Sequence, residues 1–492
     1  MWGRRWLVSN VIGWALLQAL SGCGGKSSTE VPRAQRDTSA IFGSGTRLKA
    51  HYLDGGDGAR VPVDFFDSEL STNCQFVESA SGQYHCLPAT RTRFYFDAAC
   101  SEPAYVPSPC AQIPPPPELL VSANSPECDA LASGYSLGEE RPMSMLYIRT
   151  SEGCQADQAR SAWWLVREPL ARFVQGTTSV VGAEGGLQAS RVTADDGAFL
   201  NLRLVTDGEP CSQVLDRGVP RCISGISARL SSALFDNANC DSAVAVRYLD
   251  DADRCAGRQA FVTERKSNNC VANDSVYAAL DEVTAAIYQQ QQSGECLALG
   301  DDAMPSSYFF YHAGAELSIE GAPRVNTVRV GSGALGLPCQ TDREGVPLLA
   351  PNSQVPIPQI WQLESGRKCG AIADPSGTLR CVPYGLGLPT SPIPGELGPF
   401  SDADCTRRVE TVSRDACSNE AVPNPYFIET DDALCKSTIT HAYIATPYDG
   451  PFYEMRDTIC RSAPNWRNQL TFVVGPEVDL SSFPPISDLT DQ

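Results

Sequence analysis

Positive charge is scarce in this chain. Its 492 residues carry 38 lysines and arginines against 58 aspartates and glutamates, so the formal net charge is −20 at pH 7. A strongly acidic surface repels phosphate backbones and anionic lipid headgroups. The balance therefore argues against nucleic acid as a partner and against adsorption to a membrane through basic residues. Solubility is the simplest reason for such a charge.

Histidine is equally sparse, and familiar catalytic motifs are missing. The chain has four histidines, and no two of them are spaced as ligands on one helix face. It contains no H-E-x-x-H motif, no Walker loop and no dinucleotide fingerprint. Acidic turns such as residues 250–253 lack the spacing and the terminal glutamate of an EF-hand. We expect no cofactor and no metal site, with weak calcium binding at such turns as the alternative.

Long apolar runs are absent, except for a short one near the start. Arg4 and Arg5 precede an apolar stretch at residues 7–20, which ends in the sequence L-S-G-C at 20–23. A positive start, a short apolar stretch and small residues at its end are typical of an export signal, and the stretch is too short for a stable membrane helix. The last four residues resemble the bacterial lipobox. That resemblance implies cleavage before Cys23 and a lipid on its sulfur.

The N-terminal region is therefore predicted to have two parts. Residues 1–22 form the signal peptide, and residues 23–42, rich in Gly, Ser and Thr, form a flexible tether. Gly24 stands where the enterobacterial sorting rule places an Asp for the inner membrane, so the resemblance favours the outer membrane. Which membrane face the protein occupies stays open. A plain secreted protein, in which Cys23 carries no lipid, is the alternative.

Short C-x-x-C pairs are also missing, although the chain has 20 cysteines. A zinc site is disfavoured without such pairs, and exported thiols oxidise to disulfides. Eighteen cysteines fall into three runs of six. In these runs the second cysteine follows the first by 12, 11 and 12 residues, and the sixth follows the fifth by 26, 26 and 25. These disulfide candidates are Cys74, Cys86, Cys100, Cys110, Cys128 and Cys154; Cys211, Cys222, Cys240, Cys255, Cys270 and Cys296; Cys369, Cys381, Cys405, Cys417, Cys435 and Cys460.

The repeated spacing predicts three cysteine-rich units at residues 43–183, 184–322 and 323–492. Within each unit, the first and second cysteines bracket a short turn, which favours pairing them across a hairpin. We also expect the fifth to pair with the sixth, which leaves the third with the fourth. Cys339 is left over, in a Gly- and Pro-rich insertion at about 331–354. It is predicted to be free or to pair with another molecule, and a buried, idle thiol is the simpler alternative.

Strand-like segments recur in each unit. The units open with residues 47–53, 187–192 and 325–330 and close with aromatic or β-branched runs at 163–166, 308–311 and 470–474. Gly, Pro and Asp-Gly turns between short runs predict an all-β fold. The three units stand in tandem after the signal and tether, or they close into one ring like a propeller.

Two smaller patterns refine this expectation. An aromatic-x-[Asp/Asn]-Ala-x-Cys motif ends at each third cysteine, and its aromatic should face the core while the Asp or Asn binds backbone amides. Tyrosines recur seven or eight residues after the fifth cysteine and before the sixth, which predicts two antiparallel strands between them. These are Tyr135 and Tyr147; Tyr277 and Tyr288; Tyr443 and Tyr453.

Several of these elements resemble a known group of proteins. The sequences G-T-R-L-K-A at 45–50, H-C-L-P at 85–88, F-D-A-A-C at 96–100 and A-G-A-E-L at 313–317 are similar to repeat units of cysteine-rich predicted lipoproteins of myxobacteria. The resemblance covers most of residues 43–485. It implies an exported, lipid-anchored protein with repeated units, and it implies no particular activity.

One catalytic motif is matched. Gly134, Ser136 and Gly138 fit the G-x-S-x-G nucleophile elbow, which requires a strand–turn–helix setting. The sister units keep a tyrosine at this place and no serine, which favours a core strand. Trp163 and Trp164 could stack on sugars, but alternation along a strand predicts that at least one of them is packed.

Two functions follow from these patterns. The first is a non-enzymatic, lipid-anchored envelope protein whose repeated β surface serves binding or structural roles, with an envelope protein or a glycan as partner. The alternative is an exported serine hydrolase that uses Ser136.

Overall fold

The structure is a computed structural model of the whole chain. It describes residues 37–78, 83–92, 94–107, 120–124, 132–150, 153–248, 260–268, 271–283, 286–291, 294–299, 308–350, 361–383, 385–387, 399–407, 409–413, 426–433, 436–456, 459–463 and 469–491. Within these ranges the chain forms β-strands and short 3₁₀ turns, which confirms the all-β prediction. No helix in this part of the chain is long and apolar enough to cross a membrane.

Each unit begins with a set of antiparallel strands joined by tight turns. In the first unit β2 pairs with β3, β3 with β4 and β4 with β5, and the second unit repeats this order. The strands are β2 (Leu48–Asp54), β3 (Arg60–Asp67), β4 (Thr72–Glu78) and β5 (Tyr84–Pro88); β13 (Gln188–Ala194), β14 (Phe199–Thr206), β15 (Glu209–Asp216) and β16 (Val219–Ser224); β25 (Leu335–Thr341), β26 (Pro347–Leu349), β27 (Trp361–Leu363), β28 (Lys368–Ala373) and β29 (Leu379–Pro383).

One closing strand then joins each unit to the next. These strands are β12 (Gln175–Val181), β24 (Asn326–Val330) and β38 (Pro485–Thr490). Each is placed by the same backbone hydrogen bond, in which the N–H of the unit's second cysteine donates to a carbonyl just before the closing strand. The donor–acceptor pairs are Cys86 and Val174, Cys222 and Pro323, Cys381 and Pro484, at 2.9, 2.9 and 2.8 Å.

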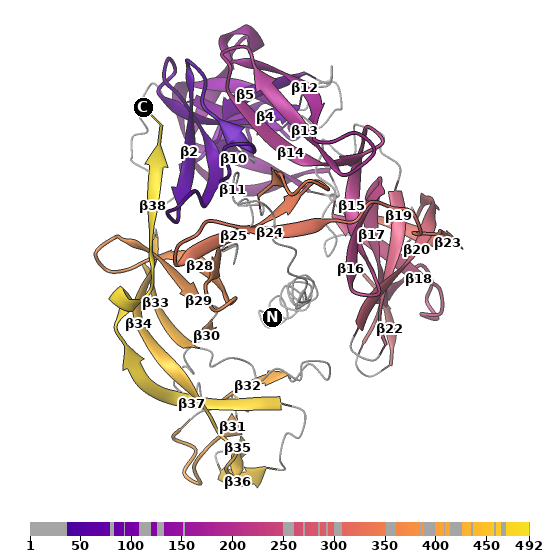
Figure 1. The fold of residues 1–492 in the computed structure, drawn as a ribbon, viewed down its shortest axis with the longest axis vertical. Helices are drawn as coiled ribbons and strands as arrows, with labels where there is room; N and C mark the ends of the chain where they lie inside the picture. The colour runs from indigo at the N-terminus through magenta and orange to yellow at the C-terminus, as the bar shows by residue number, and fades with distance from the viewer. Residues whose placement is uncertain are drawn as a thin grey trace.

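The strand pairing closes on itself. β12 pairs with β5 and with β13 of the second unit, and β24 pairs with β25 of the third. β38 pairs with β29 and, across the whole length of the sequence, with β2 of the first unit (Figure 1). The three units therefore form a ring. The tandem units do not form separate domains, because strands at the unit boundaries complete their hydrogen bonds in the neighbouring unit.

The ring differs from a propeller, which keeps a separate sheet for each blade. Here one sheet continues through all three units. A single central core also draws on all three, including Leu48, Ala194 and the fully buried Trp361. The unit boundaries therefore mark sequence repeats and do not separate independent cores.

The turns of neighbouring units also interlock in a cycle. Gly45 of the first unit lies so close to Asp196 in the β13–β14 turn that a β-carbon would collide with its carboxylate. Gly333 of the third unit stands in the same relation to Asp57 in the β2–β3 turn. The second unit contacts the third where the side-chain amide of Asn201 donates to the carbonyl of Leu348 at 2.7 Å. Glycine at the first two positions permits this close approach of the turns.

The start of the third unit differs from the prediction. Residues 325–330, expected to be its opening strand, mostly form β24, which occupies the closing position of the second unit. The region expected to be an insertion contains the real opening strand, β25, and Cys339 lies within it. Periodicity could not separate the two assignments, because both segments are β-strands and only hydrogen bonding tells them apart.

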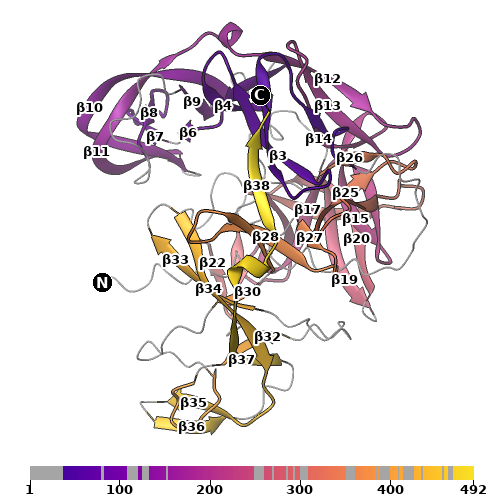
Figure 2. The ribbon, with the colours of Figure 1, turned by 60° about the vertical axis from the view of Figure 1, so that its left-hand side comes forward.

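Each unit also carries peripheral strands between its core strands and its closing strand (Figure 2). The strands are β6 (Arg91–Thr92), β7 (Phe94–Tyr95), β8 (Pro103–Tyr105), β9 (Leu120–Asn124), β10 (Ala132–Thr150) and β11 (Gly153–Arg167); β17 (Ile226–Phe235), β18 (Ala243–Tyr248), β19 (Ala260–Asn268), β20 (Val271–Glu282), β21 (Tyr288–Gln290), β22 (Cys296–Ala298) and β23 (Tyr308–Glu316); β30 (Gly385–Gly387), β31 (Pro399–Phe400), β32 (Glu410–Ser413), β33 (Tyr426–Ala433), β34 (Lys436–Pro447), β35 (Phe452–Arg456), β36 (Ile459–Ala463) and β37 (Gln469–Val478). In the first two units the peripheral strands form a separate sheet, whereas in the third most of them join the large sheet through β34 and β28, and only β31, β35 and β36 form a sheet of their own.

The two expected strands between the fifth and sixth cysteines do not pair with each other. In the first unit, Tyr135 and Tyr147 lie on one long strand, β10. Tyr135 pairs with Val121 of β9, whereas Tyr147 pairs with Tyr95 of β7. The other units repeat both pairings, with Tyr277 opposite Val262 and Tyr288 opposite Phe235, and with Tyr443 opposite Phe427 and Tyr453 opposite Phe400. The tyrosines thus mark strands that pair with earlier segments.

Candidate functional site

A polar pocket of about 140 Å³ lies in the second unit, where β15 meets the peripheral strands β17, β19 and β20. Its lining consists of Gln213, Ser227, Arg229, Thr263, Arg265 and Asp274. The residues come from four neighbouring strands, and two of the strands contribute residues two positions apart, which lie on the same face. We treat this polar concavity as the candidate site.

The floor of the pocket is an ion pair between a buried carboxylate and a partly exposed guanidinium. Asp274 is 4% exposed and lies opposite Arg265 on the neighbouring strand. Arg265 donates through Nε and Nη2 to the two carboxylate oxygens at 2.9 and 3.1 Å, and the backbone N–H of Leu215 donates to Oδ2 at 2.8 Å. The hydrogen bond to Asp274 raises the pKa of Arg265. The carboxylate is therefore fully paired, as a buried charge must be.

The walls and rim add neutral hydrogen-bonding groups and one free charge. Ser227 Oγ and Thr263 Oγ1 lie 3.1 Å apart, and Thr263 is buried. Gln213 and Arg229 are exposed at the mouth. Among the residues that the structure describes, none forms an ion pair with Arg229. The pocket thus holds an unpaired guanidinium above a floor whose own charges cancel.

The sister units carry apolar side chains at some of the corresponding places. Gln213 is the residue opposite the second cysteine of its unit, and the same register places Phe76 there in the first unit and Ala371 in the third. Phe76 packs edge-to-face against Phe65 at 5.2 Å. Thr263, which pairs with the residue before the repeated tyrosine, corresponds to Ile428 in the third unit. In the first unit, the same registers place Ser122 where the second unit has Thr263, and Arg91 where it has Arg229. The second unit therefore departs from both sister units chiefly at Gln213.

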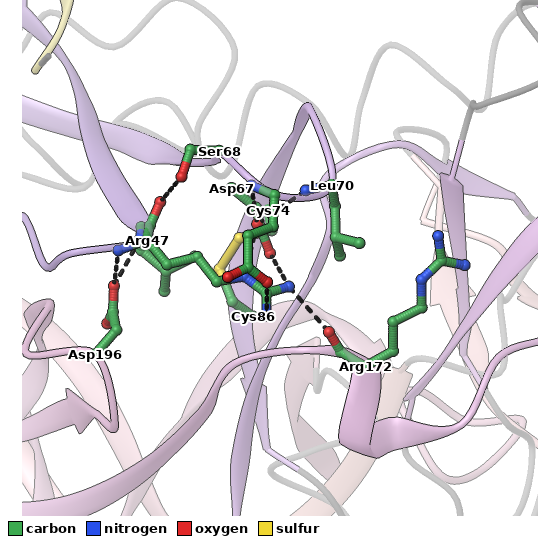
Figure 3. Close-up of polar contacts among 10 residues, drawn as sticks. Arg47, Asp67, Ser68, Leu70, Cys74, Cys86, Arg172 and Asp196 are labelled. Atoms are coloured by element: carbon green, nitrogen blue, oxygen red, sulfur yellow. Dashed lines mark hydrogen bonds and ion pairs between the residues drawn. A yellow bond between two sulfur atoms is a disulfide. The ribbon is translucent and has the colours of Figure 1, made fainter.

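A second polar cluster joins the first two units (Figure 3). Arg47 donates through Nε and Nη2 to the buried carboxylate of Asp67 at 2.8 and 2.7 Å, and through Nη2 to the carbonyl of Arg172 at 2.9 Å. Its backbone N–H donates to Asp196 of the second unit at 2.9 Å. The hydrogen bond to Asp67 raises the pKa of Arg47. The carboxylates of Asp67 and Asp196 are occupied by Arg47 or by backbone N–H groups, so we interpret this cluster as a structural joint.

A third cluster lies at the seam of the ring. His51 of β2 places Nδ1 2.6 Å from Asp64 and Nε2 2.5 Å from Asp488 of β38. The hydrogen bond to Asp64, with help from Asp488, raises the pKa of His51 to about 9. The imidazolium is therefore charged at neutral pH and holds the last strand to the first unit. It also has no open coordination position for a ligand.

The disulfides confirm one of the three predicted pairs in each unit. Cys74 joins Cys86, Cys211 joins Cys222 and Cys369 joins Cys381, with Cα–Cα distances of 5.2, 5.4 and 5.3 Å. Each bond links the two strands of a hairpin, as the short sequence separation and the intervening turn predicted.

The remaining prediction was wrong, because the third cysteine pairs with the sixth. The pairs are Cys100 with Cys154, Cys240 with Cys296, and Cys405 with Cys460. A third–fourth or fifth–sixth bond is thereby excluded in every unit. The separations of 54, 56 and 55 residues are nearly constant and could have signalled this pairing. The fifth-to-sixth step is equally constant, so spacing alone could not decide. Cys110, Cys128, Cys255, Cys270, Cys417 and Cys435 lie outside the described residues.

The turn before each third cysteine behaves as its sequence predicts. Asp97 Oδ1 accepts from the backbone N–H groups of Ser101 and Glu102 at 2.9 and 2.7 Å, and Asn237 and Asp402 accept from equivalent amides. The third cysteines have positive φ values of 52°, 53° and 51°. The motif aromatics Tyr95, Phe235 and Phe400 are buried. The acidic side chains are thus occupied by the turn.

Cys339 is a free, buried thiol, as its place outside the repeat predicted. It belongs to the central core, and burial raises its pKa to about 12. The thiolate is the reactive form of cysteine. A thiol with so high a pKa and no exposed surface is a core side chain, which supports the simpler alternative.

Ser136 does not occupy a nucleophile elbow. It lies within β10, paired with Val166 of β11, where the motif requires a strand–turn–helix junction. Its hydroxyl bonds to Glu168, and this bond lowers the pKa of that carboxyl. Neighbouring Trp163 packs with Tyr105 and Leu165, whereas Trp164 stacks on Phe96 on the opposite face, so both tryptophans are packed as alternation predicted.

The other histidines are dispersed over the molecule. His85 is buried and burial lowers its pKa; His312 lies 3.3 Å from Asp236; His441 lies 2.6 Å from Glu477. In the ranges that the structure describes, no three His, Cys, Asp or Glu side chains gather in a way that could hold a metal ion. Cys23 and the acidic turn at 250–253 lie outside these ranges.

Comparison with known proteins gives one match. A profile described as "Family of unknown function (DUF7481)" matches residues 31–320, which include the first two units and the pocket. No curated protein and no solved structure matches the chain.

Proposed function

This chain belongs to DUF7481, a family of unknown function, and we propose a function for it from its own residues. The protein is a non-enzymatic, lipid-anchored protein of the bacterial envelope, and its β ring is a rigid scaffold for binding. Its lipid is attached at Cys23, and the outer membrane is its site. Its partner is a small molecule or glycan of the envelope that reaches the pocket of the second unit.

The observation that carries this proposal is a polar pocket set in a repeated, disulfide-bonded frame. The frame consists of the closed ring and its two kinds of disulfide, which recur in all three units. Disulfides of this density suit an oxidising compartment outside the cytosol. Where the first unit has the packed Phe76 and the third has Ala371, the second unit has Gln213, which lines the polar pocket. A rigid frame around a polar pocket suits a binding protein, because a preorganised site loses less entropy on binding.

The anchor is tested by labelling growing cells with an alkyne-bearing fatty acid. The full-length protein should take up the label and sediment with outer-membrane vesicles, whereas Cys23→Ser should lose the label and appear in the soluble fraction. Cys339→Ser is the matched control and should keep the label, because Cys339 is buried. Equal labelling of the Cys23→Ser variant and the wild type would contradict the proposal.

The absence of hydrolytic activity needs a separate test. The purified protein should not react with a fluorophosphonate probe, because Ser136 lies in a regular strand and bonds to Glu168. Labelling that disappears in Ser136→Ala would establish the hydrolase instead.

A further inference from the structure

We propose that the pocket of the second unit binds a short monocarboxylate, in the size range of acetate, glycolate and lactate. The guanidinium of Arg229 would hold the carboxylate, with Gln213, Ser227 and Thr263 as hydrogen-bonding partners. This inference deepens the proposed binding role by naming a ligand class, and it does not depend on the lipid anchor.

The charge of the pocket selects an anion. Asp274 is matched by Arg265 and by the N–H of Leu215, so the floor is electrically balanced. Arg229 is the remaining charge, and the described residues provide it with no acidic partner. The chain has a net charge of −20, so an arginine without a described acidic partner is a local positive charge on a mostly negative molecule. A planar guanidinium matches a carboxylate through two parallel hydrogen bonds.

The same charges discriminate between anions. A dianion such as phosphate or sulfate would gain from Arg229 but would be repelled by the carboxylate of Asp274, which lines the same pocket. A monocarboxylate carries half that charge and suffers less repulsion. The pocket therefore favours a single negative charge.

Size and depth set the length of the ligand. A cavity of about 150 Å³ in another protein holds benzene, which has six carbon atoms, so a volume of about 140 Å³ accommodates a ligand of about six heavy atoms. The exposed Arg229 and Gln213 stand at the mouth, and the buried Thr263 lies on the floor. A carboxylate at the mouth would place a short chain or a hydroxyl next to the hydroxyl groups of Ser227 and Thr263. Hydroxyl groups both donate and accept hydrogen bonds, so they suit a hydroxy acid.

The test is saturation-transfer difference NMR of acetate, glycolate and lactate with the mature full-length protein in detergent micelles, at constant ionic strength. We expect saturable transfer to at least one of the acids, with a Kd in the millimolar range. Arg229→Gln should weaken it at least tenfold. Equimolar sulfate or phosphate should displace the ligand poorly.

Arg167→Gln is the matched control, because Arg167 is an exposed arginine at the end of β11 in the first unit. It removes the same charge from the molecule and should leave binding unchanged. Thr263→Val tests the floor with a side chain of similar shape and should weaken the hydroxy acids more than acetate. No saturable binding, equal losses in Arg229→Gln and Arg167→Gln, or displacement by phosphate as effective as by lactate would overturn the assignment. Such a failure leaves the labelling of Cys23 unaffected, so the two proposals can fail separately.

Discussion

At the scale of single residues, the seam of the ring depends on one charged histidine. His51 has two carboxylate partners, Asp64 from its own unit and Asp488 from β38. The unfolded pKa of histidine is about 6.5, and the fold raises it to about 9. A group whose pKa rises on folding stabilises the fold fully below its unfolded pKa and loses this effect as the pH rises through the folded value. The seam should therefore be strongest below about pH 6.5 and weaken toward pH 9 and above.

We predict that His51→Gln lowers the free energy of unfolding by about 1–2 kcal/mol at pH 6 and by little at pH 10. The value at pH 6 is modest because His51 is partly exposed and solvent weakens its ion pairs. Urea denaturation at a series of pH values measures the difference. His441→Gln is the control, because His441 forms a similar pair with Glu477 on an exposed surface, and it should change stability little at either pH. A loss that is equal at pH 6 and pH 10 would show that the charge of His51 is irrelevant.

The joint between the first two units depends on Arg47. Its removal leaves the carboxylate of Asp67 uncompensated, and this side chain is fully buried. Breaking a buried pair by removing one partner costs about 3–5 kcal/mol, and we predict a loss near the lower limit for Arg47→Met because Arg47 is partly exposed. The double variant Arg47→Met/Asp67→Asn should recover part of that loss in urea denaturation. If the loss of stability in the double variant equals the sum of the losses in Arg47→Met and Asp67→Asn, the two residues are not coupled.

At the scale of strands and hairpins, disulfide pairing follows strand pairing. The first and second cysteines lie on the two strands of one hairpin. The third and sixth meet because the strand that precedes the third pairs with the strand or hairpin that leads to the sixth. In the first unit this contact is Tyr95 opposite Tyr147, and in the third it is Phe400 opposite Tyr453. The aromatic motif and the tyrosine thus bring together two segments that are far apart in the sequence.

Mass spectrometry of a non-reduced digest should therefore join the peptides of Cys100 and Cys154, Cys240 and Cys296, and Cys405 and Cys460. In Cys154→Ala, the thiol of Cys100 should become available to an alkylating reagent, and the stability should fall by about 2–5 kcal/mol. Cys339→Ala is the control and should leave every cross-linked peptide in place. A peptide that joins Cys128 to Cys154 would contradict the structure.

At the scale of the whole molecule, the last strand of the chain completes the first unit. β38 supplies hydrogen bonds to Leu53 and its neighbours on β2, and Ile486 packs into the central core. Closure removes free sheet edges, which otherwise invite aggregation. The three units should unfold together at their shared core, because none of them has a complete sheet alone.

Removal of residues 479–492 should lower the midpoint of thermal unfolding by more than about 5 °C and raise the hydrogen-exchange rate of the β2 amides. The double variant Cys405→Ala/Cys460→Ala is the control, because it alters only the peripheral part of the third unit. Its β2 amides should exchange as in the wild type. Unchanged protection of β2 after the truncation would contradict ring closure.

The sequence by itself determined the local features of this protein. Three cysteine frames, their all-β character and the hairpin bonds such as Cys74–Cys86 follow from short separations and from turns that few residues can form. The buried aromatics before the third cysteines and the extra thiol of Cys339 follow from the same repeat. These features are local, so their signals lie within a few residues of one another.

Tertiary structure alone decided the rest, for a physical reason. Residues 325–330 are compatible with an opening or a closing strand, and only the hydrogen bond between Cys222 and Pro323 assigns them. Any strand edge can accept another strand, so sequence periodicity does not specify the partner. The pairing of β38 with β2, the third–sixth disulfides and the pocket formed by Gln213, Arg229 and Asp274 all depend on that choice of partner. They arise when the ring closes.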